Sequence, residues 1–274
     1  MSEREDTGTQ PVFPPEIEEI IFSLCIQQGL QNTKSLSLVA KRVHEWLKPH
    51  LYKVAMLYDN TSHYGRPNFD SQVLKKHGRY VRHILLWEVG SEEAYFLQPS
   101  TCLSWCPNIM DIALWHPGTV YDEDLIDRLL GLPLTHISFD ITRFHNDLTK
   151  HSISKRVSFT SVTHLDLNGM RITLPVEKIK GYFPSLTHMA LNKERELSAE
   201  AILGCWGDQF EVLIWYTNLD SETGDRLPDD PRFIALPQTW AWINEWHEAT
   251  KDGPSSIWRR AEEEVRRRRQ GLGM

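Results

Sequence analysis

Apolar residues recur along the chain in a six-position pattern, apolar-x-x-apolar-x-apolar, which begins again at intervals of 24 to 28 residues. The copies are Val81/Ile84/Leu86, Ile109/Ile112/Leu114, Leu134/Ile137/Phe139, Val162/Leu165/Leu167, Leu186/Met189/Leu191 and Phe210/Leu213/Trp215. The alternation at the end of each copy puts apolar side chains on one face of an extended segment, which is typical of a short strand. The sequence therefore predicts a series of repeated strands.

These intervals fall within the roughly 20–29 residues of a leucine-rich repeat. Three copies also share a polar pair at one register: Thr135-His136, Thr163-His164 and Thr187-His188. A shared Thr-His pair is hard to explain by chance similarity among unrelated strands. The copies are therefore interpreted as true repeats.

Helical signals lie between the predicted strands, at residues 70–77, 122–130 and 175–180, and Ser198 is suited to cap a fourth helix. Residues 233–236 are a candidate last strand. Strands alternating with helices predict a coil with a parallel sheet on its inner side. The predicted fold class is α/β: a short, irregular leucine-rich-repeat-like solenoid over residues 59–236.

The amino-terminal part has a different pattern. Residues 1–10 are polar without periodicity and predict a disordered tail, whereas residues 11–58 predict a head of three short helices. The first helix carries one apolar stripe, and the third is expected to end or bend at Pro49. Residues 51–58 alternate enough to form a strand or a hinge into the repeats. The apolar stripe is made of Ile17, Ile20, Ile21 and Leu24.

The carboxyl-terminal residues 237–274 are rich in aromatic side chains and contain two further helical patterns, at 238–250 and 255–269. Trp246 falls on the apolar face of the first, and Ile257 and Val265 on that of the second. This composition predicts a helical cap that covers the open end of the repeat array.

The composition excludes some classes of function but does not identify one. A net charge of −7 argues against a general binder of nucleic acid backbones, which normally has a large basic excess. No stretch approaches the roughly 18 apolar residues of a membrane span, and the amino terminus lacks a signal-peptide core. The four cysteines form no dense framework and are expected to be free thiols. These features predict a cytoplasmic or nuclear protein without membrane or nucleic-acid partners.

The segment 13–58 resembles an F-box, in particular the F-box-like domains of fungal proteins that continue into divergent leucine-rich repeats. The resemblance is carried by Phe13-Pro14-Pro15-Glu16-Ile17, by residues 21–24 and 36–47, by Pro49-His50-Leu51-Tyr52, by residues 77–83 and by residues 256–262. It implies that the head docks a Skp-type linker of a cullin ubiquitin ligase and that the repeats hold a protein substrate. The linker contacts implied by the resemblance are Pro14, Pro15, Ile17, Ile20, Ile21, Leu24, Leu38 and Val39.

The chain departs from the family pattern in several places. Phe13 replaces the usual leucine, and residues 27–30 replace a proline-containing turn. The asparagine ladder of regular repeats is missing at four of five expected positions, which hold Pro117, Thr142, Met170 and Glu194, with Asn218 conforming. An open and irregular solenoid is therefore expected.

Several alternatives remain at this stage. The head could be purely structural, with its apolar stripe packed internally, in a scaffold or other binding module without a ligase link. The row of His136, His164 and His188 could bind a metal, but a repeat-encoded ladder is the preferred interpretation. The arginines at 266–269 could form a nuclear-import signal or a charge-paired helix end. No catalytic motif is present, so the prediction is a non-enzymatic protein without cofactor or metal.

Overall fold

A computed structural model describes twelve parts of the chain: residues 13–26, 30–57, 71–87, 98–115, 121–150, 157–167, 172, 174–192, 197–217, 228–237, 242–250 and 256–271. The predicted tail at 1–10 and the turn at 27–29 lie outside these residues. The chain divides into two compact units, Met1–Lys53 and Val54–Met274, each of which is described by itself. Within the described parts, no helix has both the length and the apolarity needed to cross a membrane.

The first unit contains the three predicted helices, α1 (Pro15–Ile26), α2 (Leu30–Ser37) and α3 (Lys41–Leu51). Val43 and Leu47 of α3 are buried. The α1 and α3 helices are also joined by an ion pair of 2.7 Å between Arg42 and Glu18. Of the two outcomes expected at Pro49, an end is ruled out, since α3 continues for two more residues. A proline in the last turn removes only one backbone hydrogen bond, and so little helix is lost there.

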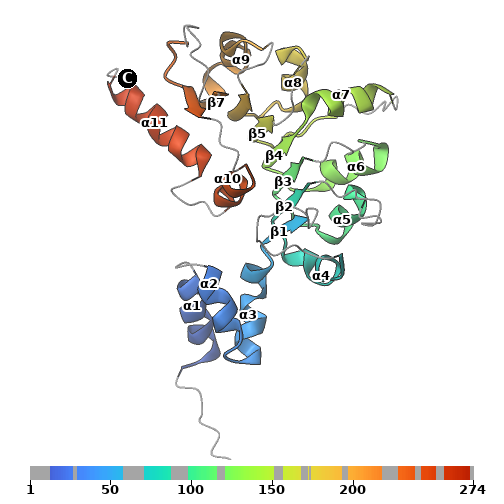
Figure 1. The fold of residues 1–274 in the computed structure, drawn as a ribbon, viewed down its shortest axis with the longest axis vertical. Helices are drawn as coiled ribbons and strands as arrows, with labels where there is room; N and C mark the ends of the chain where they lie inside the picture. The colour runs from blue at the N-terminus through green and yellow to red at the C-terminus, as the bar shows by residue number, and fades with distance from the viewer. Residues whose placement is uncertain are drawn as a thin grey trace, which may run out of the picture. The chain divides into compact units, whose positions relative to one another are not determined.

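The second unit is built on one parallel sheet in which eight strands follow one another in sequence order, from β1 to β8 (Figure 1). The strands are β1 (Val54–Leu57), β2 (His83–Leu86), β3 (Asp111–Leu114), β4 (His136–Phe139), β5 (His164–Leu167), β6 (His188–Asn192), β7 (Val212–Thr217) and β8 (Phe233–Pro237). All six repeat copies contribute a strand, and residues 54–57 and 233–237 add one at each end. This confirms an α/β fold with a solenoid-like parallel sheet.

Helices cover one face of this sheet. They are α4 (Ser71–His77), α5 (Pro99–Trp105), α6 (Glu123–Gly131), α7 (Ile141–Lys150), α8 (Val176–Tyr182) and α9 (Ala199–Trp206). The sequence located α4, α6, α8 and α9 but missed α5 and α7. Asp122 caps α6 by accepting from the Leu125 N–H at 2.9 Å, and Ser198 caps α9 by accepting from the Ala201 N–H at 3.0 Å.

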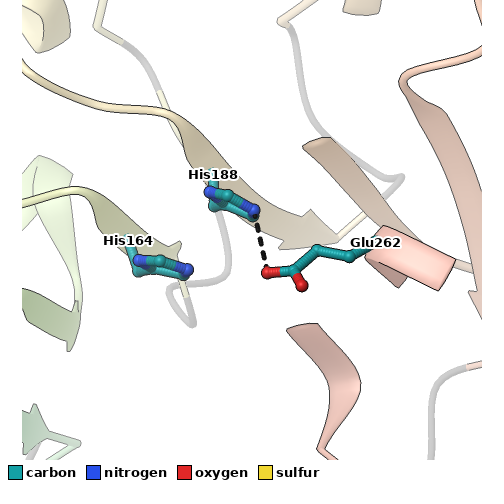
Figure 2. Close-up of side chains that lie close together, drawn as sticks. All are labelled: His164, His188 and Glu262. Atoms are coloured by element: carbon teal, nitrogen blue, oxygen red, sulfur yellow. Dashed lines mark ion pairs between the residues drawn. The ribbon is translucent and has the colours of Figure 1, made fainter. Parts of the chain in front are cut away.

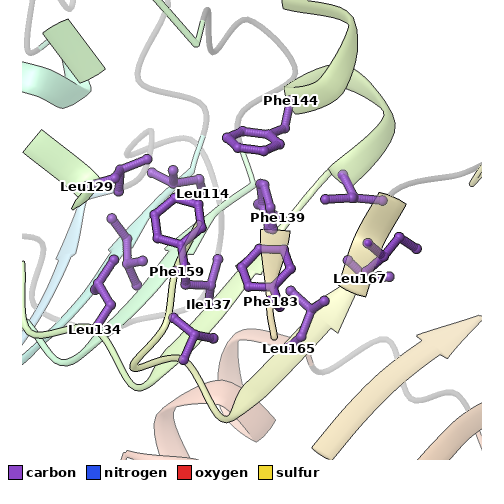
Figure 3. Packing of buried hydrophobic residues seen from close by; sticks show 14 of the residues in the cluster. Leu114, Leu129, Leu134, Ile137, Phe139, Phe144, Phe159, Leu165, Leu167 and Phe183 are labelled. Carbon is purple, nitrogen blue, oxygen red and sulfur yellow. The ribbon is translucent and has the colours of Figure 1, made fainter. Parts of the chain in front are cut away.

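The strand register aligns the repeats in columns. The second residue of each four-residue strand lies opposite its counterpart in the next strand, as Ile112, Ile137 and Leu165 do. This column and the fourth-residue column point toward α4–α9 and form the main core (Figure 3). Phe139 and Phe144 meet edge-to-face there, with ring centroids 5.1 Å apart. Because each repeat covers its neighbour, the core is continuous although no single repeat has a core of its own.

The last two helices, α10 (Trp242–Ala249) and α11 (Ile257–Gly271), lie against the opposite face of the sheet, here called the inner face (Figure 1). Trp246 of α10 packs with Met56, Leu85 and Ala113 of β1–β3. Three buried side chains of α11 pack with four buried residues on β6–β8: Ile257, Ala261 and Val265 with Ala190, Val212, Ile214 and Ile234. The sequence predicted two helices but placed them over the open end of the array. They cover the inner face because the strands at the two ends of the sheet, β1–β3 and β6–β8, carry apolar residues on that face.

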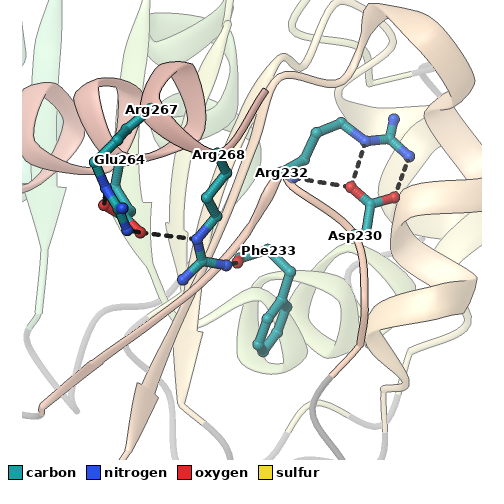
Figure 4. A network of polar contacts seen from close by, with 6 residues as sticks. All are labelled: Asp230, Arg232, Phe233, Glu264, Arg267 and Arg268. Carbon is teal, nitrogen blue, oxygen red and sulfur yellow. Dashed lines mark hydrogen bonds and ion pairs between the residues drawn. The ribbon is translucent and has the colours of Figure 1, made fainter. Parts of the chain in front are cut away.

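A polar network joins α11 to the last strand (Figure 4). Arg268 donates to the Phe233 carbonyl at 2.8 Å and also contacts Glu264 at 2.8 Å. Glu264 pairs in addition with Arg267 at 2.7 Å. These contacts favour the interpretation of the arginine run as a charge-paired helix end.

Candidate functional site

The predicted partner-binding stripe of α1 is exposed. None of the residues of this helix is buried, and the side chains of Ile20 and Leu24 retain 55% and 56% of their accessible surface. Ile17 and Ile21 lie on the same exposed stripe at 43% and 40%. Glu18 faces α3 instead, where it pairs with Arg42. The exposed surface of the stripe therefore lies outside the contacts that hold the three helices together.

The remaining predicted contacts are exposed as well. Pro14 and Pro15 stand at the start of α1, and Leu38 and Val39 form the turn that follows α2. Leu38 is 85% exposed, which is unusual for a leucine in an ordered turn. Exposed aliphatic side chains grouped on one small unit are typical of an interaction surface.

The inner face of the sheet carries a second group of polar residues. The first residues of successive strands lie side by side in the register and form a row: His83, Asp111, His136, His164 and His188. This is the repeat register that the sequence indicated, extended by two residues from β2 and β3. The imidazole rings of His136 and His164 stack at 4.1 Å, and those of His164 and His188 at 4.2 Å.

A threonine precedes each of the three stacked histidines and holds its ring. Oγ1 of Thr163 lies 2.9 Å from Nδ1 of His164, and Oγ1 of Thr187 lies 2.7 Å from Nδ1 of His188. The same hydroxyls reach the backbone carbonyl of the threonine on the preceding strand, at 3.4 and 3.2 Å. The recurring Thr-His pair therefore sets the orientation of the rings, with each Nε2 on the side away from the threonine.

Helix α11 brings a carboxylate to this row. Oε1 of Glu262 lies 3.3 Å from Nε2 of His188, and His164 and Glu262 also offer ligand atoms within 4.8 Å of each other. Figure 2 shows the two rings side by side with the carboxylate facing them. The indole plane of Trp258 is nearly perpendicular to both rings, with centroids 5.1 Å from His164 and 6.0 Å from His188. The cluster is thus enclosed by strands on one side and by α11 on the other.

Burial dominates the electrostatics of the cluster. Burial and the neighbouring histidines lower the pKa of His164 to about 2, and burial with His136 lowers the pKa of His188 to about 4. Burial, with a contribution from Glu211, raises the pKa of Glu262. Both imidazoles are therefore neutral near pH 7, which is the form that binds metal ions.

A hydrogen-bonded chain runs across the middle of the inner face. The Trp115 indole N–H donates to Oγ of Ser138 at 2.6 Å, and that hydroxyl donates to Oδ2 of Asp166 at 2.9 Å. Ser138 and Asp166 are the third residues of β4 and β5. The strands on either side carry apolar alanines at the same position, Ala113 and Ala190. The inner face is thus polar at its centre and apolar toward both ends.

One feature of this face could not have been found from the sequence. Glu262 lies within a run of charged residues on α11, and nothing in its spacing connects it with His188, 74 residues earlier. The stacking of His136, His164 and His188 was implied by their common register. Their meeting with a carboxylate depends on where α11 packs.

Together, the fold and these sites define a solenoid-like α/β protein with a separate helical unit. No family model matches the chain, and no curated protein matches it.

Proposed function

We propose that this chain is an F-box-like adaptor. Its helical unit docks a Skp-type linker of a cullin ubiquitin ligase, and its leucine-rich-type repeats present a surface to a protein substrate. The observation that carries the proposal is the exposed apolar stripe of α1, with Ile20 and Leu24 more than half exposed. The resemblance of residues 13–58 to an F-box supplies the identity of the partner.

The energetics of the stripe support docking. Complete burial of a fully exposed aliphatic side chain contributes about 1.5–3 kcal/mol, and the stripe residues, which are about half exposed, can each gain roughly half of this. Four such side chains lie on one face of α1, and Leu38 and Val39 follow α2 in the same helical unit. Together they are enough to anchor a helix-in-groove contact. Association also costs translational and side-chain entropy, so a few central anchors are expected to dominate the affinity.

The competing proposal is a scaffold whose head is purely structural. In a structural head, apolar side chains contribute to folding by being buried, and their replacement by polar groups lowers stability. The stripe residues are exposed, so a polar replacement is expected to leave the fold intact. This difference separates the two proposals experimentally.

The test is a pull-down of a Skp-type linker by the full chain, comparing wild type with Ile17→Asp and Ile20→Asp. The adaptor function predicts retention of the linker by wild type and its loss from both variants, because a buried unpaired carboxylate opposes docking. Leu130→Asp is a matched control, since Leu130 is 36% exposed on α6 and lies outside the stripe. It should retain the linker as wild type does.

Circular dichroism of all four proteins establishes that they are equally folded. No retention of the linker by folded wild-type chain would overturn the adaptor proposal. Loss of folding in Ile17→Asp or Ile20→Asp would favour a structural head instead.

A further inference from the structure

We propose that His164, His188 and Glu262 bind one divalent transition metal ion of the zinc class, through two Nε2 atoms and one carboxylate oxygen (Figure 2). The three residues come from strands β5 and β6 and from helix α11. The site is separate from the partner-binding stripe of α1. The proposal therefore does not depend on the adaptor function.

The separations within the cluster fit a metal ion. Zinc binds histidine nitrogen and carboxylate oxygen at about 2.0–2.2 Å, so two ligand atoms of a tetrahedral site lie about 3.3–3.6 Å apart. Nε2 of His188 and Oε1 of Glu262 are 3.3 Å apart. This pair is already at the separation that one shared ion requires.

The hydrogen bonds of the threonines favour the required tautomer. Each hydroxyl has one proton, and the Thr163 and Thr187 hydroxyls can donate it to a backbone carbonyl. Nδ1–H of His164 and of His188 then donates to the hydroxyl oxygen, at 2.9 and 2.7 Å. This leaves both Nε2 atoms with a free lone pair. Metal-binding histidines are typically oriented in this way by a partner on the other ring nitrogen.

The contact between His188 and Glu262 calls for a cation. The His188 side chain is 5% exposed, and among the described residues no hydrogen bond reaches its Nε2. A lone pair and a carboxylate oxygen are both acceptors, so their close approach in a buried setting is unfavourable unless a cation lies between them. A proton could serve for this pair alone. A metal ion also explains why the third group, His164, is presented to the same carboxylate.

The type of ligand indicates the class of metal. Two imidazoles and one carboxylate suit zinc and its neighbours, whereas magnesium and calcium prefer sites made only of oxygen ligands. Three protein ligands leave a coordination position for water, as in known sites with two histidines and one glutamate. The charged residues of α11 that influence Glu262 are Arg259, Glu263 and Arg266, and Glu211 lies on the chain before β7.

Binding needs only a small rearrangement. The ligand atoms of His164, His188 and Glu262 all lie within 4.8 Å of one another, so any pair not yet at the separation of about 3.4 Å set by a tetrahedral ion must approach by at most about 1.4 Å. Tilting of one ring achieves this. The ion would then connect α11 directly to the inner face of the sheet.

The test is a titration of the full-length chain, free of any affinity tag and dialysed against a chelator, with zinc chloride in a calorimeter. The proposal predicts one zinc per chain and a rise in the melting temperature on binding. Cobalt(II) in the same site should develop the intense visible absorption of a four- or five-coordinate ion.

Matched variants use the repeated register as an internal control. His188→Gln and Glu262→Gln each remove a ligand and should weaken zinc binding by at least about tenfold. Loss of a residue that only orients a ligand already weakens metal binding by about that much. His83→Gln changes the histidine that begins β2, which contacts Asp111 and neither of the proposed ligands, and should leave the affinity unchanged. Thr187→Val removes the partner of Nδ1 and should weaken binding about 10–100-fold, whereas Thr135→Val should not.

No zinc bound by wild type would overturn the proposal. Binding that is unchanged in Glu262→Gln or in His188→Gln would overturn it as well, because the ligands would then lie elsewhere. Glu262 is partly exposed on α11, so Glu262→Gln is the variant least able to disturb folding.

Discussion

The indole N–H of Trp246 donates a hydrogen bond of 3.3 Å to Oδ1 of Asp111, although 135 residues separate the two along the chain. Asp111 begins β3, and its other oxygen lies 3.4 Å from Nδ1 of His83. The contact therefore ties α10 to the row of polar residues on the inner face. It is made where Trp246 also packs against Met56 and Leu85.

Replacing Trp246 should show how much this contact stabilises the second unit. Trp246→Ala removes a buried ring and should lower the free energy of unfolding by about 3–5 kcal/mol. Trp246→Phe keeps most of the ring but leaves Oδ1 of Asp111 without its donor, which should cost about 1–3 kcal/mol. Urea unfolding followed by circular dichroism measures both values. Equal stability of Trp246→Phe and wild type would contradict a role for the hydrogen bond.

Gly78 is expected to be intolerant of even a methyl group. A Cβ at this position would meet the backbone carbonyl oxygen of Trp105 and would lie 2.9 Å from Sγ of Cys106. Since backbone atoms cannot move aside cheaply, Gly78→Ala should lower the free energy of unfolding by about 1–3 kcal/mol. Gly204→Ala is the control. It lies within α9 with no neighbour near the added methyl, and it should stabilise by about 0.5–1 kcal/mol.

The buried histidines predict a loss of stability in acid when no metal is bound. The pKa values of His164 and His188 in the folded chain, about 2 and about 4, lie below the ordinary value of 6.5. Between these values the unfolded chain binds protons that the folded chain does not, so stability falls as the pH drops below 6.5. The slope should approach about 1.4 kcal/mol per pH unit for each histidine.

Urea unfolding at several pH values, in the presence of a chelator, measures this slope. Glu262 acts in the opposite direction near its own pKa, which burial raises, so Glu262→Gln should make the dependence steeper. His188→Gln should make it shallower. A free energy of unfolding that is the same at pH 7 and pH 5 would refute the prediction.

The four thiols should differ in reactivity. All four cysteines are free, and burial raises the pKa of both Cys102 and Cys106 to about 12. Thiol reagents react with the thiolate, so these two cysteines should react only after unfolding. Cys25 and Cys205 are partly exposed and should react in the folded chain. Titration with a chromogenic disulfide before and after denaturation should therefore count two thiols and then four.

Much of the second unit could be predicted because its pattern is local and repeated. The strand template located six strands, and the Thr-His register correctly placed His136, His164 and His188 in adjacent positions of the sheet. The helix α7 was missed although its apolar residues Ile141, Phe144 and Leu148 follow helical spacing. This helix begins directly after β4, so its first apolar residue, Ile141, continues the alternating apolar pattern of the strand.

The candidate sites were predictable to different degrees. The stripe from Ile17 to Leu24 was visible in the sequence as helical periodicity, but a periodic apolar face reads the same whether it is buried or exposed. Its exposure, 55% at Ile20, is a property of the folded chain. Glu262 gave no signal at all, because the residues that it faces are distant in sequence.

The sequence by itself determined the parallel strands, their order and the register that stacks the histidines, because a repeat of nearly constant length places equivalent residues side by side. Only the tertiary structure decided where α10 and α11 lie. Their apolar faces could have covered an open end or a sheet face, and the choice depended on which strand positions were left uncovered. That choice brought Trp246 to Asp111 and Glu262 to His188, and it created the cluster proposed to hold a metal.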